Sequence, residues 1–120
     1  MAQRVLVVDD DAPIRTMIVA VLTREGYEVD EAFSGQQALE EIAWDGYQAI
    51  VLDLMMPFIS GFDVLRAISN ARPDSRCVVV MSAASQTNLD EVNSPLVRAK
   101  LRKPFDVAEL IEAVRSCTGG

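Results

Sequence analysis

The chain has 120 residues, of which half are hydrophobic and 24% are charged, and its formal net charge is −7. This length allows one domain to bury a proper core without disulfides or a structural metal, so we expect a single domain over residues 1–120. The acidic balance argues against direct nucleic-acid binding, which requires a basic face. We find neither a secretory signal nor an apolar run that could span a bilayer, and therefore expect a cytoplasmic domain without membrane contact.

Short β-branched runs alternate with longer amphipathic stretches along the chain. The runs are Arg4–Val8, Glu28–Ala32, Ala49–Leu52, Cys77–Met81 and Ala99–Arg102. Several are apolar throughout, which is typical of strands that are buried on both faces. The alternation predicts an α/β fold, with a five-stranded parallel sheet, helices on both faces and the flavodoxin-like strand order 2-1-3-4-5.

The amphipathic stretches carry helix start and stop signals. The first helix is predicted to begin after the N-cap Asp11, with Pro13 in its first turn, and to end at Gly26. Further helices are predicted from Ser34-Gly35 to Asp45-Gly46, from Ser60-Gly61 to Arg72-Pro73-Asp74, and after the N-cap Asp106.

The segment before the last strand is less regular than the others. Leu89, Val92 and Leu96 have helical spacing, but Asn93-Ser94-Pro95 interrupts it. We therefore expect a short or distorted helix there.

The two cysteines, Cys77 and Cys117, form no CxxC motif, and the chain has no histidine to complete a metal-ligand set. Both are expected to be free thiols in a reducing cytosol.

Polar side chains follow four of the predicted strands, at the edge where such sheets bind ligands. They are Asp9, Asp10 and Asp11 after the first strand, Asp53 after the third, Ser82 after the fourth and Lys103 after the fifth. Carboxylates that converge on one edge repel one another, and Mg²⁺, which prefers oxygen ligands and phosphate, would resolve that conflict. An aspartate nucleophile beside a cation, a lysine and a hydroxyl has the parts needed for phosphoryl transfer.

Each of these residues also has an ordinary structural explanation when it is taken alone. Asp11 can serve as an N-cap, Asp53 can cap a turn, and Lys103 can be a surface lysine. The prediction therefore rests on their combination at adjacent strand ends.

The runs Val5–Asp11, Val51–Pro57, Ser82-Ala83 and Lys103–Phe105 resemble the receiver domain of two-component response regulators, and the single-domain arrangement is like that of chemotaxis regulators. The resemblance implies that Asp53 accepts a phosphoryl group from a sensor histidine kinase or a histidine phosphotransfer protein. It implies that Mg²⁺, with Mn²⁺ as an alternative ion, binds Asp9, Asp10, Asp53 and the backbone carbonyl of Met55. Ser82 would be the switch hydroxyl, and Lys103 would contact the phosphoryl group.

The resemblance further implies a downstream effector protein, and a cis peptide between Lys103 and Pro104. Such a domain is not an enzyme, because it catalyses only its own phosphorylation and dephosphorylation. The resemblance leaves open the oligomeric state. It also leaves open whether the chain stands alone or was cut from a longer regulator.

Three positions depart from the family pattern. Lys100 stands where receivers usually carry an aromatic residue, Pro95-Leu96 replaces small residues, and Phe58 follows the proline of the third-strand motif. A lysine cannot bury its ammonium group as an aromatic ring is buried. An alternative is therefore an atypical receiver that acts mainly as a protein-binding module with altered phospho-switching.

Two other classes fit less well. A phosphatase with an aspartyl nucleophile would need an acid two residues after it, where this chain has Met55. A flavin- or nucleotide-binding domain would need a glycine-rich or Ser/Thr-rich phosphate loop after the first strand, and none is present.

Overall fold

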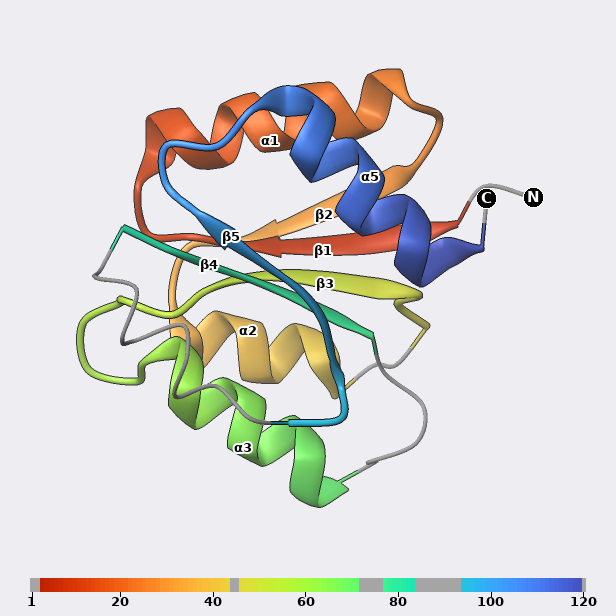
Figure 1. Ribbon diagram of the computed structural model, residues 1–120. Coiled ribbons are helices and arrows are strands. Elements are labelled where there is room, and N and C mark those ends of the chain that lie inside the picture. Colours follow the sequence, from red (N-terminus) through yellow and green to blue (C-terminus); the bar gives the residue numbers. More distant parts are fainter. Residues whose placement is uncertain (1–2, 44–45, 72–76, 84–93, 120) are drawn as a thin grey trace.

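The computed structural model describes residues 3–43, 46–71, 77–83 and 94–119. The strands are β1 (Arg4–Val8), β2 (Glu28–Ala32), β3 (Ala49–Asp53), β4 (Val78–Ser82) and β5 (Val97–Arg102), and the helices are α1 (Ala12–Arg24), α2 (Gly35–Ile42), α3 (Gly61–Ala71) and α5 (Val107–Thr118). All neighbouring strands pair in parallel, in the order β2-β1-β3-β4-β5. The predicted fold class and strand order are confirmed (Figure 1).

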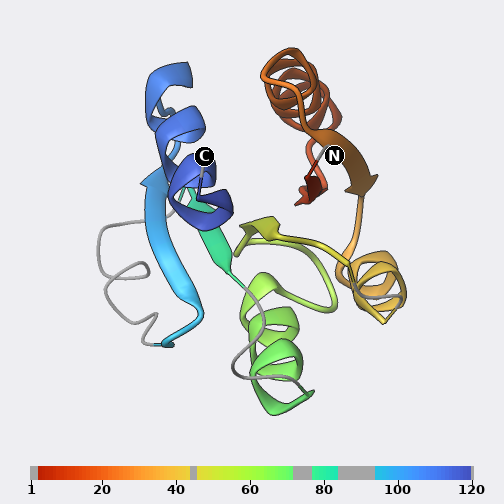
Figure 2. The ribbon, with the colours of Figure 1, turned by 90° about the vertical axis from the view of Figure 1, so that its right-hand side faces the viewer.

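Helices cover both faces of the sheet, with α1 and α5 on one side and α2 and α3 on the other (Figures 1 and 2). Alternate residues of each central strand therefore enter different cores. Val5 and Val7 pack in the core under α1 and α5, whereas Leu6 and Val8 pack in the core over α2 and α3. This explains why the three central strands, β1, β3 and β4, are apolar at every position but one. No helix within the described residues is long and apolar enough to cross a membrane.

The predicted helix starts are confirmed by their caps. Asp11 Oδ1 accepts the N–H of Ile14 at 3.2 Å, and Ser34 Oγ accepts the N–H of Gln37 at 3.1 Å. At α5 the Glu109 carboxylate reaches back to the N–H of Asp106 at 3.3 Å. These side chains satisfy helix N–H groups that lack a partner within the helix.

The element ends differ from the sequence prediction by a few residues. β3 includes Asp53 and β4 includes Ser82, because both polar residues keep backbone pairing with a neighbouring strand. β5 begins at Val97, two residues early, after a turn in which the N–H of Val97 donates to the carbonyl of Ser94 at 3.1 Å. α2 ends at Ile42, ahead of Asp45-Gly46. The distorted helix expected before Ser94 lies outside the described residues.

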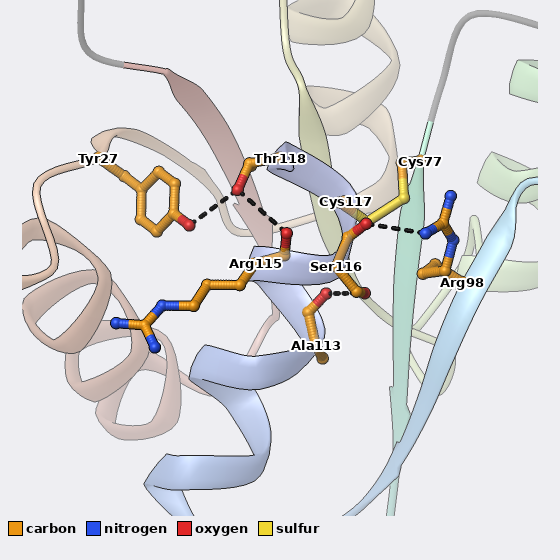
Figure 3. Close-up of a disulfide and its surroundings, with 8 residues drawn as sticks. All are labelled: Tyr27, Cys77, Arg98, Ala113, Arg115, Ser116, Cys117 and Thr118. Carbon is orange, nitrogen blue, oxygen red and sulfur yellow. Dashed lines mark hydrogen bonds between the residues drawn. A yellow bond between two sulfur atoms is a disulfide. The ribbon is translucent and has the colours of Figure 1, made fainter. Parts of the chain in front are cut away.

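The prediction of two free thiols is wrong, because Cys77 and Cys117 form a disulfide with their Cα atoms 5.6 Å apart (Figure 3). α5 runs back across the sheet from the carboxyl edge, so its last turn reaches the amino end of β4 (Figure 1). The two cysteines are 40 residues apart in the sequence, and their spacing forms no pairing motif.

Candidate functional site

Asp53 is the last residue of β3 and is buried, with only 3% of its surface exposed. Its Oδ1 atom accepts the N–H of Met55 at 3.2 Å, which fixes the direction of the carboxylate. Next to it, the N–H of Leu54 donates to the carbonyl of Met81 and extends the pairing of β3 with β4 by one bond. The sheet therefore presents the carboxylate of Asp53 at its carboxyl edge, as the sequence predicted.

The loop after β3 returns closely over Asp53. A Cβ atom on Gly61 would lie 2.2 Å from the carbonyl oxygen of Asp53 and 2.6 Å from Cα of Leu54. Only glycine allows this approach without displacing the backbone. Gly61 was expected only as a helix start. No sequence pattern marked its second role, which is to let the loop pass close to the backbone of Asp53.

The loop between β1 and α1 supplies carboxylates with different surroundings. Asp9 is fully buried, and its Oδ1 atom accepts the N–H of Asp11 at 2.9 Å. Asp10 is exposed, whereas Asp11 is used as the cap of α1. The structure therefore separates Asp11, which serves the helix, from Asp9 and Asp10, which face the site.

Arg15 is a site-supporting residue that the sequence reasoning missed. Its Nη1 atom donates to the backbone carbonyl of Asp9 at 2.8 Å, and its Nε atom donates to Glu31 at 2.8 Å. The guanidinium group thus ties the start of α1 to the backbone of the acidic loop and to β2. A single arginine on a helix carries no signal of such a contact in the sequence.

Lys103 reaches the carboxylates from the far side of the site. Its Nζ atom lies 2.8 Å from Asp9 Oδ2 and 3.5 Å from Asp53 Oδ2. The predicted cis peptide between Lys103 and Pro104 is present. Burial on its own lowers the pKa of Lys103, but the hydrogen bond to Asp9 and the charges of both carboxylates outweigh it, so the pKa is raised.

Ser82 is the last residue of β4 and is fully buried. Its carbonyl accepts the N–H of Lys103 at 2.9 Å, which joins the ends of β4 and β5. The structure therefore places Ser82 and Lys103 side by side on neighbouring strands.

The carboxylate of Asp53 is electrostatically unfavourable when ionised. Burial, and after it the negative charge of Asp9, raise the pKa of Asp53 to about 7, although the positive charge of Lys103 opposes the increase. A single lysine does not offset two buried carboxylates and the exposed Asp10.

The donor set suits a small divalent cation. Asp9, Asp10 and Asp53 each place a carboxylate oxygen so that all three atoms lie within 4.8 Å of one another. Hard oxygen ligands with room for water are what Mg²⁺ requires. Met55, whose backbone carbonyl is the fourth predicted ligand, is a half-exposed residue.

Lys100 lies on the outer face of β5, where it is exposed together with Arg98 and Arg102. These three cations occupy alternate positions of the strand. β5 is also the edge strand of the sheet. The ammonium group of Lys100 thus stays in water.

The family model described as the response regulator receiver domain matches residues 5–115. The chain belongs to the response regulator receiver family. As a receiver domain, it is a signalling domain of the two-component type. No observation favours the atypical alternative.

Known proteins resemble this receiver domain over most of its length. The transcriptional regulatory protein DltR of Streptococcus agalactiae is 38% identical over 114 residues, which are 93% of this chain and 50% of DltR. The chemotaxis protein CheY of Thermotoga maritima is 30% identical, with 95% of this chain and 96% of CheY covered. The chain thus spans about half the length of DltR but nearly all of CheY.

Among solved structures, the response regulator TrrA of Thermotoga maritima, in complex with Mg(2+)-BeF, aligns with a TM-score of 0.86 and 32% identity. The alignment covers 96% of this chain and 98% of TrrA. A receiver domain protein of Methanospirillum hungatei, described as CheY-like, aligns with a TM-score of 0.84 and 29% identity over 98% of this chain and 94% of that chain.

Proposed function

We propose that Asp53 is the phosphoacceptor of this receiver domain, and that it takes its phosphoryl group from a phosphohistidine on a sensor histidine kinase or a histidine phosphotransfer protein. One observation carries the proposal: the buried carboxylate of Asp53 lies beside the carboxylates of Asp9 and Asp10 and the ammonium group of Lys103. That arrangement supports the proposal, because phosphoryl transfer to a carboxylate needs a nucleophile, a cation and a fixed positive charge close together.

The chemistry starts from an ionised Asp53. One carboxylate oxygen attacks phosphorus, the phosphorus–nitrogen bond to the donor histidine breaks, and the imidazole nitrogen keeps the electron pair. The product is an acyl phosphate on Asp53. The N–H of Met55 holds Oδ1 in place, and Lys103 lies beside Oδ2, so the carboxylate is oriented before the donor arrives.

Asp9, Asp10, Asp53 and the backbone carbonyl of Met55 would hold Mg²⁺, which would supply positive charge against the carboxylates and the phosphoryl oxygens. Lys103 supplies a second positive charge, from the β5 side of the site. Ser82 would donate its hydroxyl to a phosphoryl oxygen.

Phosphorylation adds about −1.5 to −2 charges at one point, which attracts Lys103 and Ser82. The bond between the N–H of Lys103 and the carbonyl of Ser82 couples the two strand ends, so a shift at one is passed to the other. A downstream effector protein would read the changed surface. In this proposal the domain is cytoplasmic, acts as catalyst only on itself and makes no direct contact with nucleic acid.

The test is to incubate the protein with acetyl phosphate and Mg²⁺ and to measure the intact mass. A gain of one phosphoryl group is expected, and it should disappear in Asp53→Asn and in the presence of EDTA. Asp106→Asn, which removes a distant helix-capping carboxylate, is the matched control and should still be labelled. Labelling that survives both Asp53→Asn and EDTA would overturn the proposal.

A further inference from the structure

The disulfide between Cys77 and Cys117 lies at the edge of the sheet opposite Asp53. Cys77 directly precedes β4, and its carbonyl accepts the N–H of Ile50 near the start of β3 at 3.0 Å. Asp53 ends the same strand three residues later, roughly 10 Å away along β3. The disulfide and the candidate phosphorylation site are therefore separate features at opposite ends of one strand.

The last turn of α5 depends on the disulfide more than the rest of the helix does. Leu110, Ala113 and Val114 bury the middle of α5 in the core, but beyond Val114 only Cys117 packs against that core among the described residues. The middle of the helix is therefore held by apolar packing, whereas its end is not.

The hydrogen bonds and ion pairs that the last turn forms with other elements, among the described residues, are at most partly buried, and Figure 3 shows two of them, Tyr27 with Thr118 and Arg98 with Ser116. These hydrogen bonds and ion pairs are Tyr27 Oη with Thr118 Oγ1 at 2.9 Å, Gln3 Nε2 to the Thr118 carbonyl at 2.8 Å, Arg98 Nη1 to the Ser116 carbonyl at 2.8 Å, and Arg115 Nη2 to Glu25 at 2.9 Å. Water and salt compete with such contacts, so the disulfide is the dominant restraint on this turn.

We propose that Cys77–Cys117 is a reversible redox site, which a dithiol reductant opens and which, when opened, releases the last turn of α5 while leaving the carboxyl edge of the sheet unchanged. Both cysteines are only partly buried, so a thiolate can reach them. Disulfides that form in a reducing compartment are usually transient and redox-sensing. The proposal rests on the cytoplasmic location given under the proposed function, but it is independent of phosphorylation at Asp53.

The reaction is thiol–disulfide exchange. A reductant thiolate attacks one Sγ atom, the bond between the two protein sulfurs breaks, and a mixed disulfide forms. The second thiol of the reductant then displaces the protein sulfur. The reductant leaves as its own disulfide, having given two electrons and two protons, and the protein is left with two thiols.

The consequence is a change of surface on α5 and β5. Arg98 of β5 donates to the Ser116 carbonyl, so release of the last turn also frees this guanidinium group on an edge strand. A protein that binds this surface would then respond to the redox state.

The experiment compares oxidised and dithiothreitol-treated protein in native buffer. Alkylation with iodoacetamide and intact mass should find no reactive thiol before treatment and two afterwards, without denaturant. Amide hydrogen exchange over residues 115–118 should accelerate by at least about tenfold, because the covalent link no longer restrains local opening of the last turn. The amide chemical shifts of residues 51–53 of β3, which do not depend on global stability, should stay the same.

The control is the double variant Cys77→Ser/Cys117→Ser, which should exchange like reduced protein whether or not dithiothreitol is present. If this variant does not fold, reduced and alkylated wild-type protein replaces it. Thiols that react before reduction, a bond that opens only in denaturant, or unchanged exchange over residues 115–118 would each overturn the proposal. A failure of acetyl phosphate labelling would count against Asp53 alone.

Discussion

Lys103 donates a hydrogen bond of 2.8 Å to Asp9, while the carboxylate of Asp53 lies farther from the same nitrogen, at 3.5 Å. Asp9 is fully buried, and the side chain of Lys103 is 11% exposed. The lysine thus compensates a buried carboxylate when no phosphoryl group is present. A phosphoryl group on Asp53 would compete with Asp9 for this ammonium group.

Replacing Lys103 with methionine should lower the free energy of unfolding by about 3 kcal/mol at neutral pH, because it leaves buried carboxylates without a partner. Mg²⁺ should restore part of the loss. Urea denaturation with and without Mg²⁺ measures both effects. Lys100→Met makes the same substitution at an exposed lysine, and it should change the free energy of unfolding by less than about 0.5 kcal/mol. Equal losses in the two variants would contradict the assignment.

The raised pKa of Asp53 predicts a pH dependence of stability in EDTA. Between its ordinary pKa of 3.8 and the folded-state pKa of about 7, the folded protein binds more protons at Asp53 than the unfolded chain does. This contribution to stability is therefore fully present below pH 3.8 and is lost as the pH rises towards 7. The difference between wild type and Asp53→Asn, measured by urea denaturation at several pH values, isolates it. A difference that does not change with pH would refute the prediction.

Asp10 and Asp11 make a matched pair for the cation site. Asp10→Asn should weaken Mg²⁺ binding at least about tenfold, because it removes a negative ligand from the cluster. Asp11→Asn should leave the affinity nearly unchanged, since asparagine also caps helices and Asp11 serves α1. Isothermal titration calorimetry with Mg²⁺ measures the affinities of the two variants. A larger loss in Asp11→Asn would mean that the two roles are exchanged.

Phe58 has a φ angle of 65° and a fully exposed side chain. A bulky residue in the left-handed region is strained, and glycine relieves that strain at the expense of greater freedom in the unfolded chain. Phe58→Gly should therefore raise the free energy of unfolding by about 1 kcal/mol. Phe58→Ala retains a Cβ atom and should gain little. Thermal denaturation of the two variants is the measurement, and a gain in alanine equal to that in glycine would rule out backbone strain as the cause.

The disulfide closes a long loop, because its cysteines are 40 positions apart in the sequence. Loop-closure entropy then predicts that the free energy of unfolding of Cys77→Ser/Cys117→Ser is about 4 kcal/mol lower than that of the oxidised protein. Dithiothreitol should destabilise the wild type by a similar amount and leave the variant unaffected. Chemical denaturation under both conditions tests this, and equal stability of reduced and oxidised wild type would exclude a stabilising bond.

Much of the fold was predictable because it follows from local patterns. Apolar runs and N-caps such as Asp11 and Ser34 predicted the strands and helix starts, and parallel topology then placed Asp9, Asp53 and Lys103 at one edge. The failures concern contacts that depend on how segments pack in three dimensions, which local patterns do not encode.

Three such contacts were missed. The disulfide depends on where α5 ends relative to β4. The hydrogen bond from Arg15 to the Asp9 carbonyl depends on the angle between β1 and α1. The requirement for glycine at position 61 depends on how closely its loop passes over Asp53. None of these distances follows from residue spacing.

The cationic outer face of β5 has a consequence for the protein in concentrated solution. An edge strand offers unpaired backbone groups to which a strand of another chain can add. Arg98, Lys100 and Arg102 stand at alternate positions along this edge, so a second copy of β5 would meet like charge at each of them. The face that lacks the aromatic residue usual in receivers is thereby also a barrier against aggregation through the β5 edge of the sheet.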